Sequence, residues 1–272
     1  MAHHPPLIIK IGGAALENEV TAPSVWKAIA QIHTARAGGV VLVHGGGQAV
    51  DRHLERLGLT SERRDGIRVT PPEHVEEIAA VLAGKINKSI VGELAKHQVK
   101  AVGVCLSDGM SFKVIRSKKY AFDAGRVGEV VQAHGFDGGL LRVLLKGHFL
   151  PVVSSIGLDE KGFLNVNADD AAAALARELS GAALILLTDV PGILDGDKRV
   201  VGETTALDIE AMISAGSITG GMIVKARAAA ATAASTGVPV VILSGNNPSS
   251  LADWSAGRKA GTRVVPTEGA RS

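Results

Sequence analysis

The sequence predicts an α/β protein with an open, mainly parallel central sheet sandwiched by helices and arranged as two lobes. Three observations predict this class. Short aliphatic runs alternate with helical patterns along the chain, as in doubly wound α/β folds. The runs are almost continuously apolar, which suits parallel strands that are buried on both faces. Apolar residues make up 46% of the 272 residues and aromatic residues only 3%, so the core must be largely aliphatic.

Strands are expected where a short aliphatic run is bounded by glycine, proline or charge. These runs are 7–11, 40–43, 101–106, 150–154, 184–187 and 238–243. Helices are expected where apolar residues recur with helical spacing. These segments are 24–37, 48–57, 72–97, 140–146, 169–179, 207–215 and 222–236. Segments 64–69 and 111–131 alternate polar and apolar residues, and we expect them to form hairpins, lids or extensions of the sheet.

The chain is expected to fold as a single domain, residues 1–272, because it contains no repeat and no linker rich in Pro, Ser or charge. A domain of this size can contain two closely packed lobes. The clearest boundary between them is Asp159–Gly162, after the fourth core strand. We therefore expect an N-terminal lobe of about residues 1–160 and a C-terminal lobe of about residues 161–272.

Composition excludes several classes of protein. The net charge is +2 and the chain contains no long basic run, so a nucleic-acid binder is not expected. A single cysteine, Cys105, excludes an intramolecular disulfide and a cysteine-based zinc cluster, and it is expected to be a small core residue. The sequence has no apolar stretch of membrane-spanning length and no signal-peptide pattern at residues 1–6. We therefore expect a cytoplasmic protein without a membrane partner.

The first glycine-rich turn, Lys10 to Gly13, directly follows the first strand. Ligands of open α/β sheets collect at the carboxyl ends of the strands. The backbone N–H groups of Gly12 and Gly13 could therefore bind phosphate oxygens beside the lysine ammonium. Taken alone, a tight turn with a solvent-facing lysine explains this pattern equally well.

The second turn, Gly45 to Gly47, ends a strand and opens a helix near Gln48. Such a helix N-terminus presents N–H groups and a positive dipole to an anion. The spacing matches neither the dinucleotide fingerprint nor the Walker loop. His44 is expected to pack under the turn as a strand-end residue.

The third turn, Gly220 to Lys225, opens the helix that runs to residue 236. A lysine near a helix N-terminus is disfavoured by the helix dipole, so a bound anion would account for Lys225. Three turns of this kind suggest a protein that holds two negatively charged groups together, which is the physical problem of a kinase.

Two acidic positions accompany these turns. Asp169 follows Asn165 and Asn167, and it is expected at or near the N-cap of the next helix, where it could also hold lysines by charge-assisted hydrogen bonds. The two Asn residues at period two would point the same way from an extended segment and could recognise a polar substrate group. Asp189 ends a buried strand and could face a nucleotide.

Eight short stretches of the chain recur in the order and roughly the spacing of one known family. They are IIKIGG, VLVHGGG, GIRVTP, LAGKINK, LPVVSSIG, NVNAD, LILLTDVPGILDG and GGMIVK. Over essentially its whole length the chain resembles the N-acetylglutamate kinases, of the amino-acid kinase fold, and in particular their short, enterobacterial type. Each stretch is modest alone, but eight in order are very specific.

The resemblance implies that ATP phosphorylates the side-chain carboxylate of N-acetyl-L-glutamate, the second step of arginine biosynthesis. It implies that Lys10 and Lys225 stabilise the transferring phosphoryl group and that Asp169 organises both lysines. A carboxylate nucleophile with a pKa of about 4.3 is already ionised at neutral pH and needs no general base. Catalysis then reduces to positioning and charge stabilisation, for which lysines and backbone amides are suited.

The resemblance also implies the binding residues. Gly46 and Gly47 would hold the substrate near its reacting carboxylate, Arg68 would bind its α-carboxylate, and Asn165 would help to bind its acetamido end. The residues expected to bind ATP are Gly12, Gly13, Asp189, Val190, Pro191, Gly192, Ile193, Leu194, Ser217, Ile218 and Thr219. Mg²⁺ would be held mainly by phosphates and water, so no protein ligand is assigned.

The chain departs from the family pattern at residues 242–247 and 106–109, neither of which includes the lysines. Its first strand begins by Leu7, which leaves no room for the N-terminal helix of the arginine-inhibited, hexameric members. We therefore expect a homodimer that is insensitive to arginine, with segment 72–97 as the candidate dimer surface.

Two rival functions stay open at this point. The first is another acyl-phosphate kinase of the same fold, acting on an α-aminoadipate derivative or on carbamate. The second is a non-catalytic amino-acid sensor, against which the retention of both lysines and Asp169 argues. A nicotinamide dehydrogenase lacks its glycine fingerprint here and is set aside.

Overall fold

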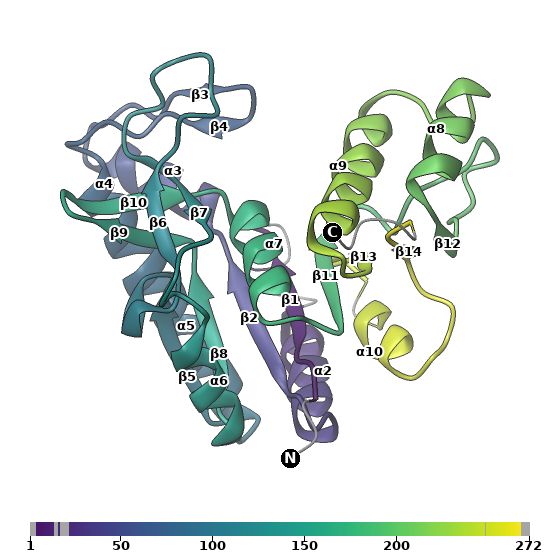
Figure 1. Cartoon of the computed structure of the whole chain (residues 1–272), viewed down its shortest axis with the longest axis horizontal. Helices are drawn as coiled ribbons and strands as arrows, with labels where there is room; N and C mark the ends of the chain where they lie inside the picture. Colours follow the sequence, from purple (N-terminus) through teal and green to yellow (C-terminus); the bar gives the residue numbers. More distant parts are fainter. Residues whose placement is uncertain (1–3, 14–15, 17–21, 248, 268–272) are drawn as a thin grey trace. The chain divides into compact units, whose positions relative to one another are not determined.

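The computed structural model describes residues 4–13, 16, 22–247 and 249–267 (Figure 1). The first three residues of the segment considered for a signal peptide lie outside this description. The chain forms two compact units: unit 1 comprises Met1–Val40 and Ser180–Ser272, and unit 2 comprises Val41–Leu179. Asp159 and Gly162, where a lobe boundary was expected, are instead paired residues that flank a turn between two strands inside unit 2. The assignment of functions to lobes stays a prediction.

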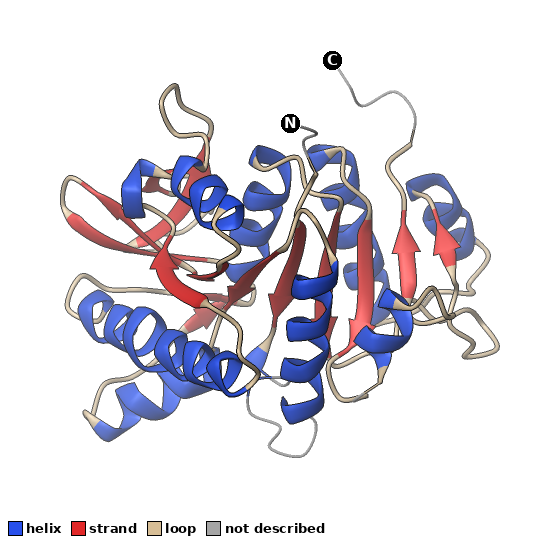
Figure 2. Cartoon of the chain, turned by 90° about the horizontal axis from the view of Figure 1, so that it is seen from below, coloured by secondary structure: helices blue, strands red, loops and turns tan. Residues whose placement is uncertain are grey.

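Helices pack beside the strands of the chain (Figure 2), and unit 1 is built mainly on parallel strands. Its strands are β1 (Leu7–Ile11), β11 (Ala183–Thr188), β12 (Glu203–Thr204), β13 (Val240–Ser244) and β14 (Thr262–Val264). Its helices are α2 (Ala22–Ala35), α8 (Ala206–Ser214), α9 (Gly221–Thr236) and α10 (Ser250–Ser255). The strand order is β12-β14-β13-β11-β1, with β1, β11 and β13 parallel and β14 antiparallel to β13. Helix α9 packs against β13 and β14, and α10 packs against β13 and α2.

Unit 2 contains a second set of parallel strands and two smaller sheets. Its strands are β2 (Val40–His44), which begins at the last residue of unit 1, β3 (Arg63–Arg64), β4 (Ile67–Arg68), β5 (Ala101–Cys105), β6 (Lys113–Arg116), β7 (Val127–Val131), β8 (Leu150–Ser154), β9 (Ile156–Asp159) and β10 (Gly162–Val166). Strands β2, β8 and β5 are parallel neighbours. Strands β6, β7, β10 and β9 form a four-stranded sheet, and β3 and β4 form an antiparallel pair.

The helices of unit 2 pack on the parallel strands, on the four-stranded sheet or on one another. They are α3 (Gly47–Arg56), α4 (Val75–Ala79), the π-helix η1 (Ala80–Ile86), α5 (Asn87–Lys96), the short 3-10 helix η2 (Asp108–Met110), α6 (Gly139–Lys146) and α7 (Ala168–Glu178). Helix α5 packs against β5 and β8, and α6 packs against β8. Each unit contains parallel strands with packed helices, so the α/β class with a mainly parallel central sheet is confirmed.

Aliphatic runs form the buried strands as expected. In β1, Leu7, Ile8, Ile9 and Ile11 are fully buried, and only Lys10 is partly exposed. Each predicted strand is present, with ends shifted by at most about two residues. The segments expected as hairpins are also confirmed, because β3 pairs with β4 and β6 pairs with β7 in antiparallel register.

The helix expected at 72–97 contains an irregular segment. Helical structure runs from Val75 to Lys96, but its middle part, Ala80–Ile86, is π-helical. Gly84 lies inside this π segment, where glycine lowers the stability of a regular α-helix. The hairpin β9–β10, helix α10 and the short strands β12 and β14 were not predicted from the sequence.

Candidate active site

Lys10 lies at the carboxyl end of β1 in unit 1, opposite Leu186 of β11. The next residues turn tightly, because the N–H of Gly12 donates to the carbonyl oxygen of Leu187 at 3.3 Å. A Cβ atom added to Gly12 would lie 3.6 Å from the Lys10 Nζ. The ammonium group therefore lies close to the glycine turn, as a phosphate-binding arrangement requires.

Lys225 of α9 contacts the carboxylate of Asp189, with 2.7 Å between Nζ and Oδ1. Asp189 follows β11, and Thr188 donates a hydrogen bond of 2.8 Å to the same carboxylate oxygen. The hydrogen bond from Lys225, supported by that from Thr188, lowers the pKa of Asp189. A lysine near a helix N-terminus is disfavoured by the helix dipole, and the carboxylate of Asp189 offsets this effect for Lys225.

The neighbouring ends of β1 and β11 thus bring together the Lys10 turn and the Lys225–Asp189 ion pair within unit 1. Strand β13 ends at the same edge, since the N–H of Gly245 donates to the carbonyl oxygen of Thr188 at 2.7 Å. This is the location where open α/β sheets bind ligands. Among the predicted catalytic residues, the structure places Lys10 and Lys225 in one unit and Asp169 in the other.

The segments expected to bind ATP also lie in unit 1. Gly192 has a φ of 154°, and a Cβ there would lie 2.7 Å from the Thr262 Oγ1. The N–H of Ile193 donates to that same hydroxyl oxygen at 2.8 Å. The side chains of Ile193 and Ile218 are 0% and 1% exposed. They belong to the core, so only the backbone of these two residues is available to a nucleotide.

In unit 2, Gly46 and Gly47 open helix α3 as expected. Gly46 has a φ of 154°, a conformation that L residues rarely adopt. A Cβ on Gly46 would lie 2.1 Å from the Ile86 Cδ1 and 3.1 Å from the Leu82 Cδ2. Glycine is therefore required here both by the backbone and by the close approach of the π-helix.

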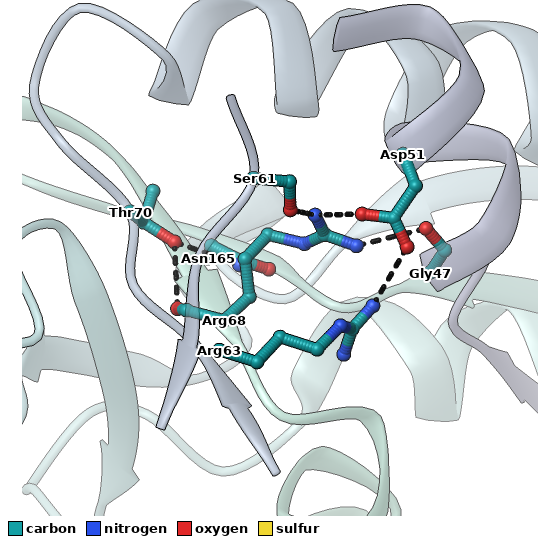
Figure 3. Close-up of polar contacts among 7 residues, drawn as sticks. All are labelled: Gly47, Asp51, Ser61, Arg63, Arg68, Thr70 and Asn165. Carbon is teal, nitrogen blue, oxygen red and sulfur yellow. Dashed lines mark hydrogen bonds and ion pairs between the residues drawn. The ribbon is translucent and has the colours of Figure 1, made fainter. Parts of the chain in front are cut away.

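Arg68 lies at the end of β4 and its side chain is only 7% exposed. It donates hydrogen bonds to Asp51, to Ser61 and, at 2.8 Å, to the carbonyl oxygen of Gly47 (Figure 3). The carbonyl oxygen of Arg68 accepts a hydrogen bond of 3.1 Å from the Thr70 hydroxyl. Arg68 is thus fixed beside the glycine turn.

Asn165 of β10 reaches the same cluster. Its Nδ2 donates to the Thr70 Oγ1 at 3.1 Å, and Thr70 in turn contacts Arg68 (Figure 3). Thr70 is fully buried and links the Asn165 side chain to the backbone carbonyl oxygen of Arg68. The structure therefore brings together three of the four predicted substrate residues, Gly47, Arg68 and Asn165, with Gly46 adjacent to the first.

Asp51 completes this cluster and was not identified from the sequence. It follows Gly47 by one helical turn on α3 and accepts hydrogen bonds from Arg68 and, at 3.0 Å, from Arg63. The spacing of four residues from a glycine turn, on the face that carries the turn, is the signal that could have identified it. Its basic partners lie on a hairpin whose position the sequence does not give.

Asp169 is not the N-cap of α7. Asn167 takes that position, and its side chain accepts hydrogen bonds from the N–H groups of Asp169 and Asp170 at 2.8 and 3.2 Å. Asp169 therefore lies near the N-cap, as one of the two expected placements had it, and Asn167 is the cap because it has the extended backbone that a cap requires. Asp169 instead lies in the first turn, where a carboxylate is favoured by the helix dipole. That it organises the two lysines stays a prediction.

His44 packs under the glycine turn as expected and is fully buried. Its Nδ1 lies 2.9 Å from the carbonyl oxygen of Gly45, and its Nε2 lies 3.1 Å from the Asn87 Nδ2. A carbonyl oxygen can only accept, so Nδ1 has the proton and Nε2 accepts from the amide. Burial lowers the pKa of His44 to about 4, although the hydrogen bond to Gly45 opposes this shift.

This buried imidazole makes stability depend on pH. In the unfolded chain the His44 imidazole is protonated as the pH falls below about 6.5, whereas in the folded protein it stays neutral down to about pH 4. The contribution of His44 to the free energy of unfolding should therefore be complete above pH 6.5 and decrease by roughly 3 kcal/mol as the pH falls to 4. Urea denaturation of the wild type and of His44→Gln between pH 7 and pH 4 measures it. An equal pH dependence in both proteins would contradict the assignment.

Within the residues that the structure describes, no group of three or more His, Cys, Asp or Glu side chains is placed to hold a metal ion. No helix in the same residues is long and apolar enough to cross a membrane.

The match to a known family defines the class of protein. Residues 5–244 match the model of the amino acid kinase family, and the chain belongs to this family. The amino-acid kinase fold expected from the sequence is therefore confirmed.

Individual proteins refine this comparison. Acetylglutamate kinase from Pectobacterium atrosepticum is 41% identical over 261 residues, which cover 96% of this chain and 99% of that protein. The structure of N-acetylglutamate synthase from Neisseria gonorrhoeae with coenzyme A and N-acetyl-glutamate is similar with a TM-score of 0.78 at 23% identity, covering 96% of this chain and 59% of that one. Carbamate kinase from Giardia lamblia bound to AMP-PNP gives a TM-score of 0.67 at 19% identity, covering 98% and 100%. These two structural likenesses support the fold alone.

Proposed function

We propose that this protein is an acetylglutamate kinase, which transfers the γ-phosphoryl group of ATP to the side-chain carboxylate of N-acetyl-L-glutamate. The products are N-acetyl-L-glutamyl 5-phosphate and ADP, in the second step of arginine biosynthesis. The observation that carries the proposal is the 41% identity to an acetylglutamate kinase over nearly the full length of both chains. The Gly47–Arg68–Asn165 cluster of unit 2 supports it, because it combines a cation with neutral polar groups around a glycine turn.

In the proposed reaction a carboxylate oxygen of the substrate attacks the γ-phosphorus of ATP. The bond from this phosphorus to the β,γ-bridging oxygen breaks, and ADP leaves with that oxygen. No proton has to be removed, because the carboxylate is already ionised at neutral pH. The protein therefore has to hold two anions close together and to offset the charge that develops between them.

The residues divide between these tasks. Lys10 and Lys225 stabilise the transferring phosphoryl group, and Asp169 is proposed to orient them. Gly46 and Gly47 hold the reacting end of the substrate, Arg68 binds the α-carboxylate, and Asn165 helps to bind the acetamido group. The turns at Gly12 and Gly13, Asp189 to Leu194 and Ser217 to Thr219 are proposed to bind ATP.

A kinase that uses ATP requires a divalent cation, and we propose Mg²⁺. This ion keeps several waters and is commonly held by substrate phosphates with few protein ligands. The ion would offset negative charge on the triphosphate.

We further propose that the protein is a cytoplasmic homodimer and that its substrates are small molecules. The candidate dimer surface is the helical run from Val75 to Lys96. Sedimentation equilibrium measures the assembly. A monomer, or a dimer that persists after charged substitutions are placed on exposed positions of this run, would contradict the proposed surface.

A coupled assay that traps the acyl phosphate with hydroxylamine tests the reaction. We expect product with N-acetyl-L-glutamate and ATP, and none with glutamate or N-acetylaspartate. Product with an α-aminoadipate derivative or with carbamate instead would favour another acyl-phosphate kinase. Absence of ATP turnover with every acid tested would favour a non-catalytic sensor of the same fold.

A further inference from the structure

Asp51 binds two arginine side chains from the β3–β4 hairpin. Its Oδ1 accepts a hydrogen bond from the Arg68 Nη1, and its Oδ2 accepts one from the Arg63 Nη2 at 3.0 Å (Figure 3). The Arg68 side chain is 7% exposed and that of Asp51 is 37% exposed. Asp51 therefore links the first turns of helix α3 to the β3–β4 hairpin.

Among the described residues, hydrogen bonds occupy only some of the N–H donors of the Arg68 guanidinium. Its Nη1 also donates to the Ser61 Oγ, and its Nη2 donates to the carbonyl oxygen of Gly47. An arginine has five N–H donors. Three of them have acceptors among the described residues, which leaves two for a ligand. Two donors of one guanidinium match the two oxygens of a carboxylate.

The charge of the cluster also suits an anion. One carboxylate, Asp51, faces two guanidinium groups, so the cluster is positive by one charge. Both groups approach the glycine turn, because a Cβ on Gly47 would lie 3.0 Å from the Arg63 Nη2 and 3.7 Å from the Arg68 Nη2. A buried arginine without a partner would cost folding free energy. Asp51 removes this cost and still leaves the net positive charge that a substrate carboxylate requires.

We propose that Asp51, with help from Ser61, is a positioning residue that fixes Arg68 in the orientation that binds the α-carboxylate of the acidic substrate. The inference rests on the proposed function and assigns to that site a residue that touches Arg68, not the substrate. An arginine side chain loses rotamer freedom when it binds a ligand, and holding it beforehand removes part of this loss. Holding Arg68 in its binding orientation should therefore increase the affinity for the substrate.

The ionisation of Asp51 keeps this arrangement constant near neutral pH. Partial burial alone would raise the pKa of Asp51, but hydrogen bonds from Arg68, Ser61 and Arg63 outweigh it and hold the pKa well below its usual range. The carboxylate thus stays charged wherever the substrate is charged. Substrate affinity should not vary with pH through Asp51 between about pH 6 and 8.

The first measurement compares Asp51→Asn with the wild type in the hydroxylamine assay. We expect the KM for N-acetyl-L-glutamate to rise at least tenfold, with kcat and the KM for ATP within threefold of the wild type. Arg64→Gln is the matched control, because Arg64 forms an exposed ion pair of 2.7 Å with Glu62 on the same hairpin and does not contact Asp51. It should leave all three constants within twofold.

The second measurement uses 4-acetamidobutyrate, which has the acetamido group and the reacting carboxylate but no α-carboxylate. By calorimetry, Asp51→Asn should weaken the binding of N-acetyl-L-glutamate at least tenfold and change that of 4-acetamidobutyrate by less than twofold. Ser61→Ala, a milder change, should weaken only the former, by twofold to fivefold, and it replaces Asp51→Asn if that variant does not fold.

Each outcome decides the inference. Equal weakening of both ligands would mean that Asp51 has only a structural role, and unchanged binding of N-acetyl-L-glutamate would mean that it does not position Arg68. Either result overturns the proposal while the wild-type activity stands. A wild type that does not phosphorylate N-acetyl-L-glutamate would instead overturn the proposed function, from which this inference starts.

Discussion

Replacing Lys225 with alanine is expected to lower kcat by about 10²–10³-fold, the effect of losing one preorganised donor from a charged transition state. The ammonium lies at the edge where β1, β11 and β13 end, and Asp189 holds it there at 2.7 Å. Charge on the transferring phosphoryl group changes as the bond to ADP breaks, so the loss falls on kcat more than on the KM for N-acetyl-L-glutamate. Initial rates from the hydroxylamine assay measure both constants.

A control for this variant lies two residues further along the same helix. Arg227 forms an exposed ion pair with Glu210 at 2.7 Å, and Arg227→Ala should leave kcat within twofold of the wild type. Lys225→Arg should give an intermediate value, because it keeps the charge but not the compact ammonium. If Lys225→Ala has a kcat within threefold of the wild type, the role given to this lysine is wrong.

Gly46→Ala is expected to decrease both stability and substrate affinity. Its φ of 154° is unfavourable for alanine, and the new methyl group would lie 2.1 Å from the Ile86 Cδ1. Overpacking and backbone strain together should reduce the free energy of unfolding by roughly 2–4 kcal/mol. Relief of the clash would move the turn that precedes α3, so we expect the KM for N-acetyl-L-glutamate to rise at least tenfold. Urea denaturation and steady-state rates are the measurements.

Gly58→Ala separates strain from packing. Gly58 also has a positive φ, 71°, but a Cβ there would meet no atom within 4 Å. This variant should lose only about 1 kcal/mol of stability and keep the wild-type KM. If Gly46→Ala behaves in the same way as Gly58→Ala, the contact with the π-helix does not constrain the glycine turn.

The parts of the fold that could be predicted are those set by local pattern. Strand β1 follows from five consecutive residues of which all but Lys10 are aliphatic, and the two lysines were identified from the glycines that accompany them. The parts that could not be predicted have weak local signals. The turn of β9–β10, Glu160 and Lys161, is flanked by Asp159 and Gly162, and this polar run resembles a connection between lobes as much as a hairpin.

The cap of α7 shows the same limit on a smaller scale. Asn167 and Asp169 are both good N-cap residues, and the sequence does not distinguish them. The choice depends on the backbone of Asn167, which stays extended because β10 ends one residue before it. The π-helix is a similar case. Segment 80–86 has the pattern of an ordinary α-helix, and Gly84 indicated an irregular helix without indicating its type.

By itself the sequence determined the α/β class, the order of the strands along the chain, the family, and the cations and glycines able to hold anions, because each follows from a local run of residues. Only the tertiary structure decided which carboxylate each cation meets: Asp51 for Arg68, 17 residues away, and Asp189 for Lys225, 36 residues away. The chain has 27 acidic residues, and composition favours none of them as a partner. The choice belongs to packing, since an ion pair forms only where the folded backbone places opposite charges within a few ångströms.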